Sequence, residues 1–277
     1  MKIPGCLAVL AVTLGACVGA QETAISARLL QFAPPDAAAS EAVRGVPMLR
    51  LPSGTLRLGC TKGDPVCAPH ELPPRVVQIR AFDLDQREVT AGDYRACVKA
   101  GGCTPPGESS SCPWADPGKT DNPIACVSWE QARTYCAWAR KRLPSEAEWE
   151  WAARGGPASR LFSWGNEYDW MHANGLGVGG RDVWPQASPV RSFPPNTYGL
   201  HDMEGNAAEW VEDCYHDSYF GSPKDGGAWT EPGCPRRVIR GGSWRDDATL
   251  LRVSARISAD PLKGEPFIGF RCARSIP

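Results

Sequence analysis

The chain has 277 residues and a formal net charge of −1, because its 30 lysines and arginines nearly balance 31 aspartates and glutamates. No run of basic residues is available to neutralise phosphates, so nothing in the sequence indicates nucleic-acid binding. The length suits one domain with an N-terminal extension, and frequent Gly, Pro and Trp indicate a fold rich in loops.

The N-terminus has the pattern of an export signal. Lys2 precedes an apolar stretch, residues 6–16, that is too short to cross a bilayer as a helix. The segment LGAC ending at Cys17 is similar to a bacterial lipobox, in which Cys17 would be lipidated. A second possible cleavage site, VGA, would leave Gln21 as the first mature residue. Either way we expect residues 1–17 to be a signal peptide and the mature protein to be exported. It would be lipid-anchored in the bacterial cell envelope, or soluble in the periplasm or secreted.

Residues 18–45 are rich in Ala, Pro and Ser. Such a segment buries too little apolar surface to offset the entropy of ordering, which predicts a flexible tether. The globular domain is expected to span residues 46–277. Alternating apolar residues predict strands at 49–58 and 75–84.

Three helices have N-terminal capping signals. Thr90 precedes the first, and capping boxes open the others, with Ser128 and Gln131 for the second and Ser145 and Glu148 for the third. Beyond residue 165, Gly, Pro, Asn and Asp recur every few residues, which predicts loops. The short strands expected in that region lie at 237–240, 251–256 and 269–273.

Cysteine usage agrees with export. Removing Cys6 and Cys17 from the twelve cysteines leaves an even number, as a disulfide framework requires. The spacings do not match a zinc knuckle, and histidines are few. Many pairings stay open, but short loops favour Cys60–Cys67, Cys97–Cys103 and Cys214–Cys234.

Four segments resemble, in the same order, signature segments of the formylglycine-generating enzyme (sulfatase-modifying factor) family. They are VSWEQARTYCAWARKRLPSEAEWEWAARGG (127–156), YGLHDMEGNAAEW (198–210), RGGSW (240–244) and GFRC (269–272). The resemblance covers about residues 47–274. It implies an α+β fold, a loop-rich and disulfide-stabilised variant of the C-type lectin fold. It also implies a structural disulfide between Cys136 and Cys272.

The chemistry for which the family is named is missing from the sequence. In the family's enzymes a pair of cysteines between RGGSW and GFRC binds copper, but residues 245–268 contain no cysteine. The two positions fall near Asp246 and Leu251, or near Ser243 and Ala248. None of these side chains replaces a thiolate for Cu(I). We therefore expect neither copper nor formylglycine generation, and we predict no catalytic residue.

Calcium is the cofactor that the resemblance implies. Oxygen donors from side chains and loop carbonyls suit Ca²⁺, which tolerates irregular geometry. One site would use Asn206 and Glu209. The other would use the side chains of Asn174 and Asp182 with the carbonyls of Gly175 and Trp184. Alternatively, Asn206 and Glu209 only satisfy backbone amides of loops.

Other charged residues are expected to serve the structure. Three glutamates, Glu146, Glu148 and Glu150, fall on different sides of one helix and do not form a catalytic pair. Three arginines, Arg240, Arg252 and Arg271, are typical of internal ion pairs in a loop-rich fold.

The family's substrate cleft lies beside RGGSW, which implies a ligand surface formed by residues 213–229 and 240–247. Its candidate residues are Trp229, Arg240, Trp244, Asp246 and Asp247. The aromatic rings offer large contact areas, although they could equally be core. The two aspartates favour a basic or hydroxyl-rich partner.

Three functions fit these observations. The first is a non-catalytic binding or structural lipoprotein of the cell envelope, which engages a protein, peptide or glycan and meets the membrane only through its N-terminal lipid. The second is a periplasmic oxidoreductase, like the family members that oxidise siderophore precursors. The third, kept as an alternative although we do not expect it, is formylglycine generation on sulfatases by a route without the copper-binding cysteine pair.

Overall fold

The structure is a computed structural model that describes residues 45–107 and 112–276. The expected signal peptide, the Cys17 lipidation site and nearly all of the tether lie outside the described residues. Among the described residues, no helix is both long enough and apolar enough to cross a bilayer.

Two small sheets form from the N-terminal strands and the end of the chain. Their strands are β1 (Met48–Leu51), β2 (Gly54–Leu58), β3 (Arg75–Ile79), β4 (Phe82–Asp85) and β9 (Ala273–Ser275). Strand β4 pairs with β1 and β9, whereas β2 pairs with β3, all antiparallel. The strands expected at 49–58 and 75–84 are therefore each divided in two. Each divides because the chain changes partner, at Pro52 in the first case and at Arg80 in the second.

The third sheet holds the central motifs and has the order β7-β6-β5-β8. Its strands are β5 (Ala208–Cys214), β6 (Arg237–Arg240), β7 (Arg256–Ala259) and β8 (Ile268–Gly269). The strand expected at 237–240 is confirmed. The central strand, β5, was not expected, because it is buried on both faces and its sequence does not alternate.

Two other strand predictions were wrong in part. Residues 251–255 are not a strand, because three of their carbonyls accept hydrogen bonds from the Arg240 guanidinium. The predicted strand at 269–273 is divided between β8 and β9. Between them, the carbonyl of Phe270 accepts from the amide of Val89, and the amide of Cys272 donates to the Asp85 carboxylate.

All three expected helices are present: α1 (Ala91–Lys99), α2 (Trp129–Trp138) and α3 (Glu146–Arg154). The two expected capping boxes form, with Ser128 Oγ accepting from the amide of Gln131 at 3.2 Å and Ser145 Oγ from that of Glu148 at 3.1 Å. Two short 3₁₀ helices, Pro69–Glu71 and Pro113–Ala115, lie in loops.

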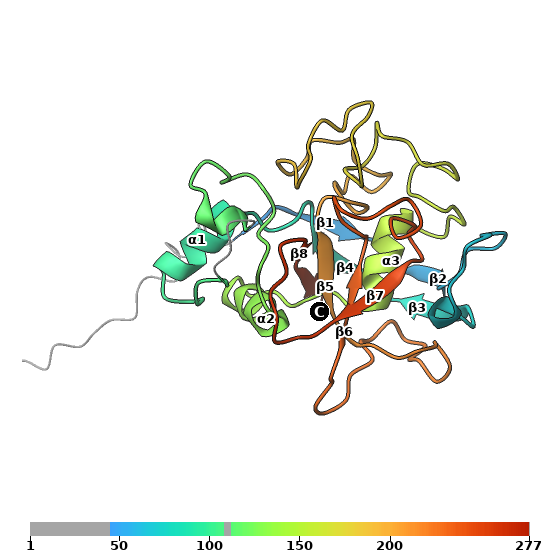
Figure 1. Cartoon of the computed structure of the whole chain (residues 1–277). Helices are drawn as coiled ribbons and strands as arrows, with labels where there is room; N and C mark the ends of the chain where they lie inside the picture. The colour runs from blue at the N-terminus through green and yellow to red at the C-terminus, as the bar shows by residue number, and fades with distance from the viewer. Residues whose placement is uncertain (1–44, 108–111, 277) are drawn as a thin grey trace, which may run out of the picture.

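The helices lie on two sides of the central sheet (Figure 1). On one side, α1 and α2 build an aromatic core in which Tyr135 stacks on Tyr94 and meets Phe270 edge-on. On the other, α3 lies between β5 and the β2–β3 pair, and every residue of α3 is buried. Trp151 of α3 packs directly against Gly54 of β2, where a side chain would clash with the indole ring.

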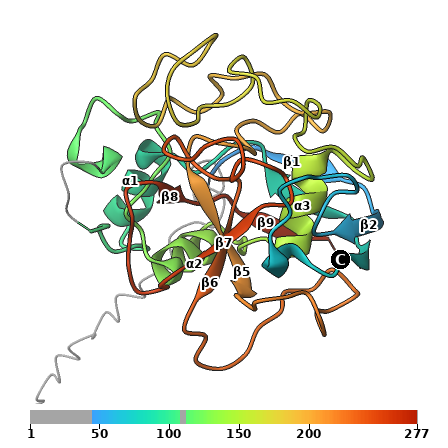
Figure 2. The same ribbon diagram turned by 45° about the vertical axis from the view of Figure 1, so that its right-hand side comes forward.

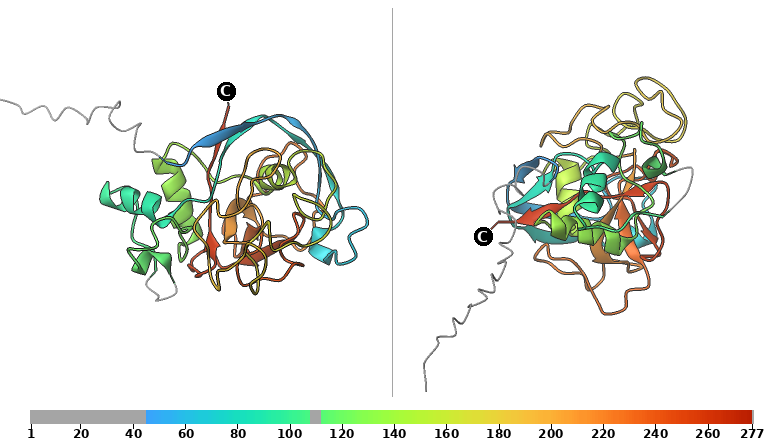
Figure 3. Two further views of the ribbon diagram at one scale, coloured as in Figure 1. Left: turned by 90° about the horizontal axis from the view of Figure 1, so that it is seen from above. Right: turned by 90° about the vertical axis from the view of Figure 1, so that its left-hand side faces the viewer.

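Long loops occupy the two ends of the central sheet (Figure 2). Residues 155–207 form the loops at one end, and residues 215–236 form those at the other. The C-terminal segment returns to lie beside β4 (Figure 3), as the pairing of β4 with β9 requires. The mixed, loop-rich α+β architecture agrees with the expected fold class.

Five disulfides cross-link the described residues. Four of them were expected: Cys60–Cys67, Cys97–Cys103, Cys136–Cys272 and Cys214–Cys234. The fifth joins Cys112 to Cys126 and was not among the expected pairs. Every cysteine of residues 45–107 and 112–276 is therefore oxidised.

Candidate functional site

The RGGSW segment begins with an arginine that is wholly internal. Arg240 is inaccessible to solvent, and its Nη2 lies 2.5 Å from Oε2 of Glu150. Arg252 and Arg271 also form buried ion pairs, with Glu71 and Glu209. The expectation of internal ion pairs is thus confirmed, and the assignment of Arg240 to a ligand surface was wrong.

The glutamates of α3 serve this same internal network. Glu146 pairs with Arg256 at 2.7 Å, Glu148 pairs with Arg142 at 2.6 Å, and Glu150 pairs with both Arg240 and Arg154. Each carboxylate is held by a guanidinium, which agrees with the structural role expected for the three glutamates.

The residues after RGG differ in their accessibility. Ser243 is buried, and its Oγ donates to Oδ2 of Asp246 at 2.6 Å. Asp247 is exposed, and hydrogen bonds from Thr249 lower the pKa of its carboxyl. Leu251 is fully buried against Phe162 and Ala173. Positions Ser243 and Leu251, where the family's sulfurs could fall, are therefore closed to solvent.

Trp244 lies at a hollow in the surface. The amide of Trp244 donates to the carbonyl of Asn206 at 3.0 Å, which fixes the segment against the GNAAEW motif. The hollow beside the half-buried indole is lined by Pro113, Lys119, Asn122, Gln186, Ala187 and Pro266. Lys119 supplies its charge, so the hollow itself is not acidic. No local sequence signal marked Lys119 as part of this hollow.

Trp229 does not share a surface with Trp244. Strands β5 and β6 are antiparallel, with Glu209 opposite Arg240 at one end and Cys214 opposite Arg237 at the other. Trp244 is bonded near the first end, whereas the carbonyl of Trp229 accepts from the amide of Cys214 at the second. The Trp229 indole stacks on His216 with ring centroids 3.6 Å apart. The single ligand surface expected from residues 213–229 and 240–247 is therefore divided between two ends of the sheet.

The structure brings the four residues of one expected calcium site together. Both carboxylate oxygens of Asp182 accept backbone hydrogen bonds, from the amides of Gly175 at 3.1 Å and Trp184 at 3.2 Å. Asn174 is completely buried, and its Oδ1 accepts no hydrogen bond from the described residues. Burial also raises the pKa of Asp182. The orphaned amide oxygen of Asn174 and the buried carboxylate of Asp182, which contacts the next residue along the chain, are oxygen donors of the kind that suits a hard cation such as Ca²⁺.

The other expected pair, Asn206 and Glu209, is not brought together as free oxygen donors. Asn206 Oδ1 accepts from the amide of Ser188 at 2.9 Å, which is the loop-satisfying role considered as the alternative. Glu209 is held instead by Arg271 at 2.7 Å and by the indole N–H of Trp149 at 2.8 Å.

A buried acidic cluster adjoins this pair. Glu88 accepts from the Asn206 side chain and the Ala207 amide, and Asp202 leaves one buried oxygen, Oδ1, without a donor. Burial raises the pKa of Asp202 to about 6. Burial and the charges of Asp202 and Glu209 raise the pKa of Glu88 well above its usual range.

Arg271 is the guanidinium that faces these three carboxylates, Glu88, Asp202 and Glu209. Protons or a bound cation must compensate the excess negative charge. The oxygen donors available to a second cation are therefore those of Glu88 and Asp202, in place of Asn206 and Glu209. Sequence reasoning missed both, because Glu88 lies 118 residues before Asn206.

Comparisons with known proteins agree with this architecture. A family model described as the sulfatase-modifying factor enzyme 1-like domain matches residues 34–276. The chain is 32% identical to the formylglycine-generating enzyme of Streptomyces coelicolor, over 87% of this chain and 92% of that protein. It is 31% identical to the inactive C-alpha-formylglycine-generating enzyme 2 of Bos taurus, over 82% of this chain and 88% of that protein. The solved structure of PvdO from Pseudomonas aeruginosa superposes with a TM-score of 0.72 and 36% identity, covering 83% of this chain and 94% of PvdO.

Proposed function

The chain belongs to the sulfatase-modifying factor enzyme 1-like family, and we propose that it is a non-catalytic member, a binding or structural protein of the cell envelope. One observation carries the proposal. All ten cysteines of residues 45–107 and 112–276 are in disulfides, so this part of the chain has no thiolate to bind Cu(I). The residues present do not fit a copper centre.

The positions that would carry the copper ligands support the same proposal. Leu251 and Ser243 are buried, and Asp246 is engaged by the Ser243 hydroxyl. A bovine relative of similar identity is itself named as inactive, so this scaffold persists without the activity in at least one other protein.

Calcium is the proposed cofactor, with a structural role. Asn174 and Asp182 would hold one ion, and Glu88 and Asp202 offer oxygens for a second. A divalent cation would compensate the buried negative charge at each place and would fix the long loops that carry these residues.

The proposed location is outside the cytoplasm, reached by export. Five disulfides are typical of proteins that fold in an oxidising compartment, which supports the cell envelope, the periplasm or secretion. Lipidation at Cys17 would tether the domain to the membrane. The proposed partner is a protein, peptide or glycan that contacts the loops around Trp244, where Lys119 and Asp247 place charges of both signs.

The test is a peptide conversion assay. Purified protein is incubated with copper, oxygen and a sulfatase-type Cys-x-Pro-x-Arg peptide, with the Streptomyces coelicolor enzyme as the positive control. The peptide mass should stay unchanged. Appearance of the aldehyde mass, and its loss on mutating a residue of this chain, would refute the non-catalytic function.

Metal content separates binding from the oxidoreductase alternative. Calcium as the metal retained through purification agrees with a binding or structural role. Iron or copper at one equivalent per chain would instead favour a periplasmic oxidoreductase.

A further inference from the structure

One short loop exposes a concentration of large apolar side chains. Nine such side chains are exposed in the part of the chain that the structure describes, and four of them lie between residues 171 and 183. They are Met171, Leu176, Val178 and Val183, with exposed fractions between 43% and 66%. Isolated exposed apolar residues are normal, but several within one short segment indicate a contact surface.

Two of these side chains come from a β-hairpin. Gly179 and Asp182 exchange two backbone hydrogen bonds of 2.8 Å, which close a two-residue turn with Arg181 at its tip. Val178 and Val183 are the next residues away from the turn, one on each strand. Side chains alternate between the two faces of a strand, so both valines project from the face opposite Asp182. Asp182 is buried, whereas the valines are 61% and 66% exposed, so the valines lie on the solvent side.

The inner face of the hairpin is occupied, so the valines cannot turn inward. Gly177 and Gly179 lie against the indole ring of Trp170, where an added Cβ would come within 3.1 and 3.0 Å of ring atoms. The buried Asp182 carboxylate accepts from the amide of Gly175 at 3.1 Å. The fold itself therefore holds the apolar side chains in water.

The exposed charge of this segment is positive. Between Trp170 and Trp184, Arg181 and Asp182 are the arginine, lysine and acidic residues of the sequence, and Asp182 is buried. Arg181 is exposed, and its Nη1 donates to the carbonyl of Ser192 at 3.3 Å. The remaining donors of a guanidinium can bind a phosphate group. The hairpin thus combines aliphatic side chains with one cation.

The acidic side chains that adjoin this segment lie at its base. Asp169 pairs with His172 at 3.1 Å. The carbonyl of Asp246 accepts from the amide of Leu176, so Asp246 and its exposed neighbour Asp247 also lie at the base. A negatively charged surface would therefore be approached with the tip of the hairpin.

These properties fit lipid better than protein. Leu and Val are under-represented among the residues that dominate protein interfaces, where Trp, Tyr and Arg lead. Aliphatic side chains beside a cation suit a bilayer that contains anionic lipids. The apolar groups enter the boundary of the acyl chains, and the cation stays at the phosphates.

The proposed lipid anchor would keep the hairpin close to such a surface. Residues 18–44 separate Cys17 from Gly45, the first residue that the structure describes. Their composition predicts a tether, and a flexible chain of this length spans about 30 Å. A weak contact then suffices, because the tether makes membrane binding effectively intramolecular.

We propose that the hairpin inserts Val178 and Val183 into the surface of an anionic phospholipid bilayer, with Arg181 at the phosphates. Leu176 and Met171 extend the apolar contact. The hairpin would add a second membrane contact to the lipid expected at Cys17. This inference rests on the proposed location in the cell envelope. It turns the end of the domain that carries residues 155–207 toward the membrane (Figure 2).

The test is flotation with vesicles. The chain from Val18 onward is exported with its disulfides behind a signal that has no lipobox. It is then mixed with phosphatidylcholine vesicles that either contain or lack phosphatidylglycerol. It should bind the anionic vesicles about fivefold more tightly than the neutral ones, which is the effect of one arginine near a charged surface. Val178→Asn combined with Val183→Asn should lower the affinity for anionic vesicles about tenfold or more, because two apolar side chains no longer leave water.

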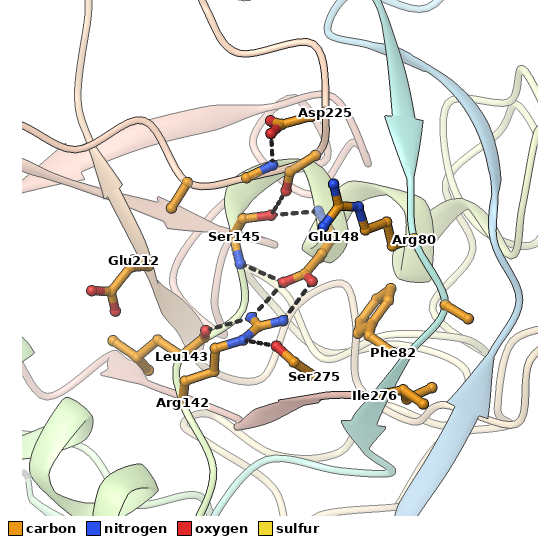
Figure 4. A pocket seen from close by; sticks show the side chains of 14 residues that line it. Arg80, Phe82, Arg142, Leu143, Ser145, Glu148, Glu212, Asp225, Ser275 and Ile276 are labelled. Atoms are coloured by element: carbon orange, nitrogen blue, oxygen red, sulfur yellow. Dashed lines mark hydrogen bonds and ion pairs between the residues drawn. The ribbon is translucent and has the colours of Figure 1, made fainter.

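Arg181→Gln should remove the preference for anionic vesicles. Its matched control is Arg80→Gln, because Arg80 is also exposed but lines a separate cavity beside the start of α3 (Figure 4). The control for the valines is Val76→Asn on β3, at a valine that is 57% exposed. Neither control should change the affinity. Melting curves of the variants, expected to match that of the unmodified chain, guard against misfolding.

Hydrogen exchange of the unmodified chain locates the contact without any substitution. Anionic vesicles should slow exchange at the amides of residues 176–183. Protection that leaves these amides unchanged would overturn the proposal. So would a failure to float with anionic vesicles, or an equal loss of affinity in Val76→Asn and in the double valine variant. A dimer that the double valine variant abolishes, without vesicle binding, would assign the hairpin to a second copy of the chain and also overturn the proposal.

Lipid labelling of Cys17 is measured separately on the full chain. Labelling of the full chain, without flotation of the unlipidated chain, would overturn the hairpin contact and leave the proposed function intact. Flotation without labelling would support the hairpin contact and remove the lipid anchor.

Discussion

Arg240 and Glu150 form an ion pair 2.5 Å long between two side chains that are wholly inaccessible to solvent. Arg240 is the last residue of β6, and Glu150 lies in the middle of α3. The same guanidinium also donates to the carbonyls of Val253, Ser254 and Ala255. One side chain thus ties together a strand, a helix and the loop that leads to β7.

Removing this guanidinium should destabilise the fold strongly. Arg240→Ala leaves Glu150 buried beside Arg154 alone and leaves three carbonyls without donors. We expect the free energy of unfolding to fall by about 3–5 kcal/mol, the usual cost of breaking a buried ion pair from one side. Urea unfolding followed by tryptophan fluorescence measures it.

The matched control is Arg50, which pairs with Asp83 at 2.6 Å while its own side chain is 64% exposed. Arg50→Ala should cost less than about 1 kcal/mol, because solvent screens that pair. Equal losses in the two variants would show that burial does not set the strength of the Arg240 pair.

Stability should fall as the pH rises from 5 to 8. Glu204 is buried and accepts from the amide and hydroxyl of Ser163. Burial raises its pKa from 4.5 to about 7. A raised carboxyl pKa means that the folded state holds the proton more tightly. The stabilisation that this bound proton gives the folded state is complete below pH 4.5. It amounts to roughly 3 kcal/mol and is lost as the pH rises from 4.5 through about 7.

Glu204→Gln isolates this effect, because the amide resembles the protonated carboxyl. Denaturant unfolding at pH 5 and pH 8, with calcium removed, should show a smaller difference in the variant than in the unmodified protein. An identical pH dependence would assign the loss to the other buried carboxyls, such as Asp202 and Asp85, whose pKa values burial raises to about 6.

Features set by neighbouring residues could be predicted from the sequence. The capping boxes of α2 and α3 bring together residues three positions apart, so their signals are complete within one turn. The strand at 237–240 and the short-loop disulfides are local in the same sense. The Cys136–Cys272 pairing came only from the family resemblance.

Features set by distant contacts could not be predicted. The sequence predicts that residues 251–255 belong to a strand, but three of their carbonyls accept hydrogen bonds from the Arg240 guanidinium instead of from a neighbouring strand. No signal in the sequence marks Glu88 as part of a site, and only the folded chain places it against Asn206 and Asp202. The candidate calcium donors therefore changed from Asn206 and Glu209 to Glu88 and Asp202, which come from two segments far apart in the chain.

The Cys136–Cys272 disulfide should contribute more stability than the Cys97–Cys103 disulfide. It closes a loop of 136 residues, whereas the other closes a loop of only 6. By the chain-entropy model the two are worth about 5 and about 2 kcal/mol. Double alanine variants of each pair, compared by denaturant unfolding, measure the difference. Free thiols at Cys136 and Cys272, detected by mass spectrometry of the native protein, would refute the bridge.

Calcium should raise the melting temperature through Asp182. A ligand at one hundred times its dissociation constant stabilises the folded state by about 2.7 kcal/mol, which corresponds to roughly 5–10 °C for a domain of this size. Asp182→Asn keeps the shape of the side chain but removes a buried charge that lies against the amide of Gly175, the residue after Asn174. We therefore expect it to lower calcium affinity at least tenfold and to remove most of the rise in melting temperature.

Asp169→Asn is the neighbouring control, because Asp169 lies in the same loop region with 47% of its side chain exposed. It should keep the full calcium response. Asp202→Asn probes the second cluster: if an ion binds there as well, titration calorimetry of this variant will lose one of two binding events, while the event at Asp182 persists. A melting curve of the unmodified protein that is the same in excess calcium and in excess chelator would exclude calcium from both places, and protons would then have to neutralise Glu88 and Asp202.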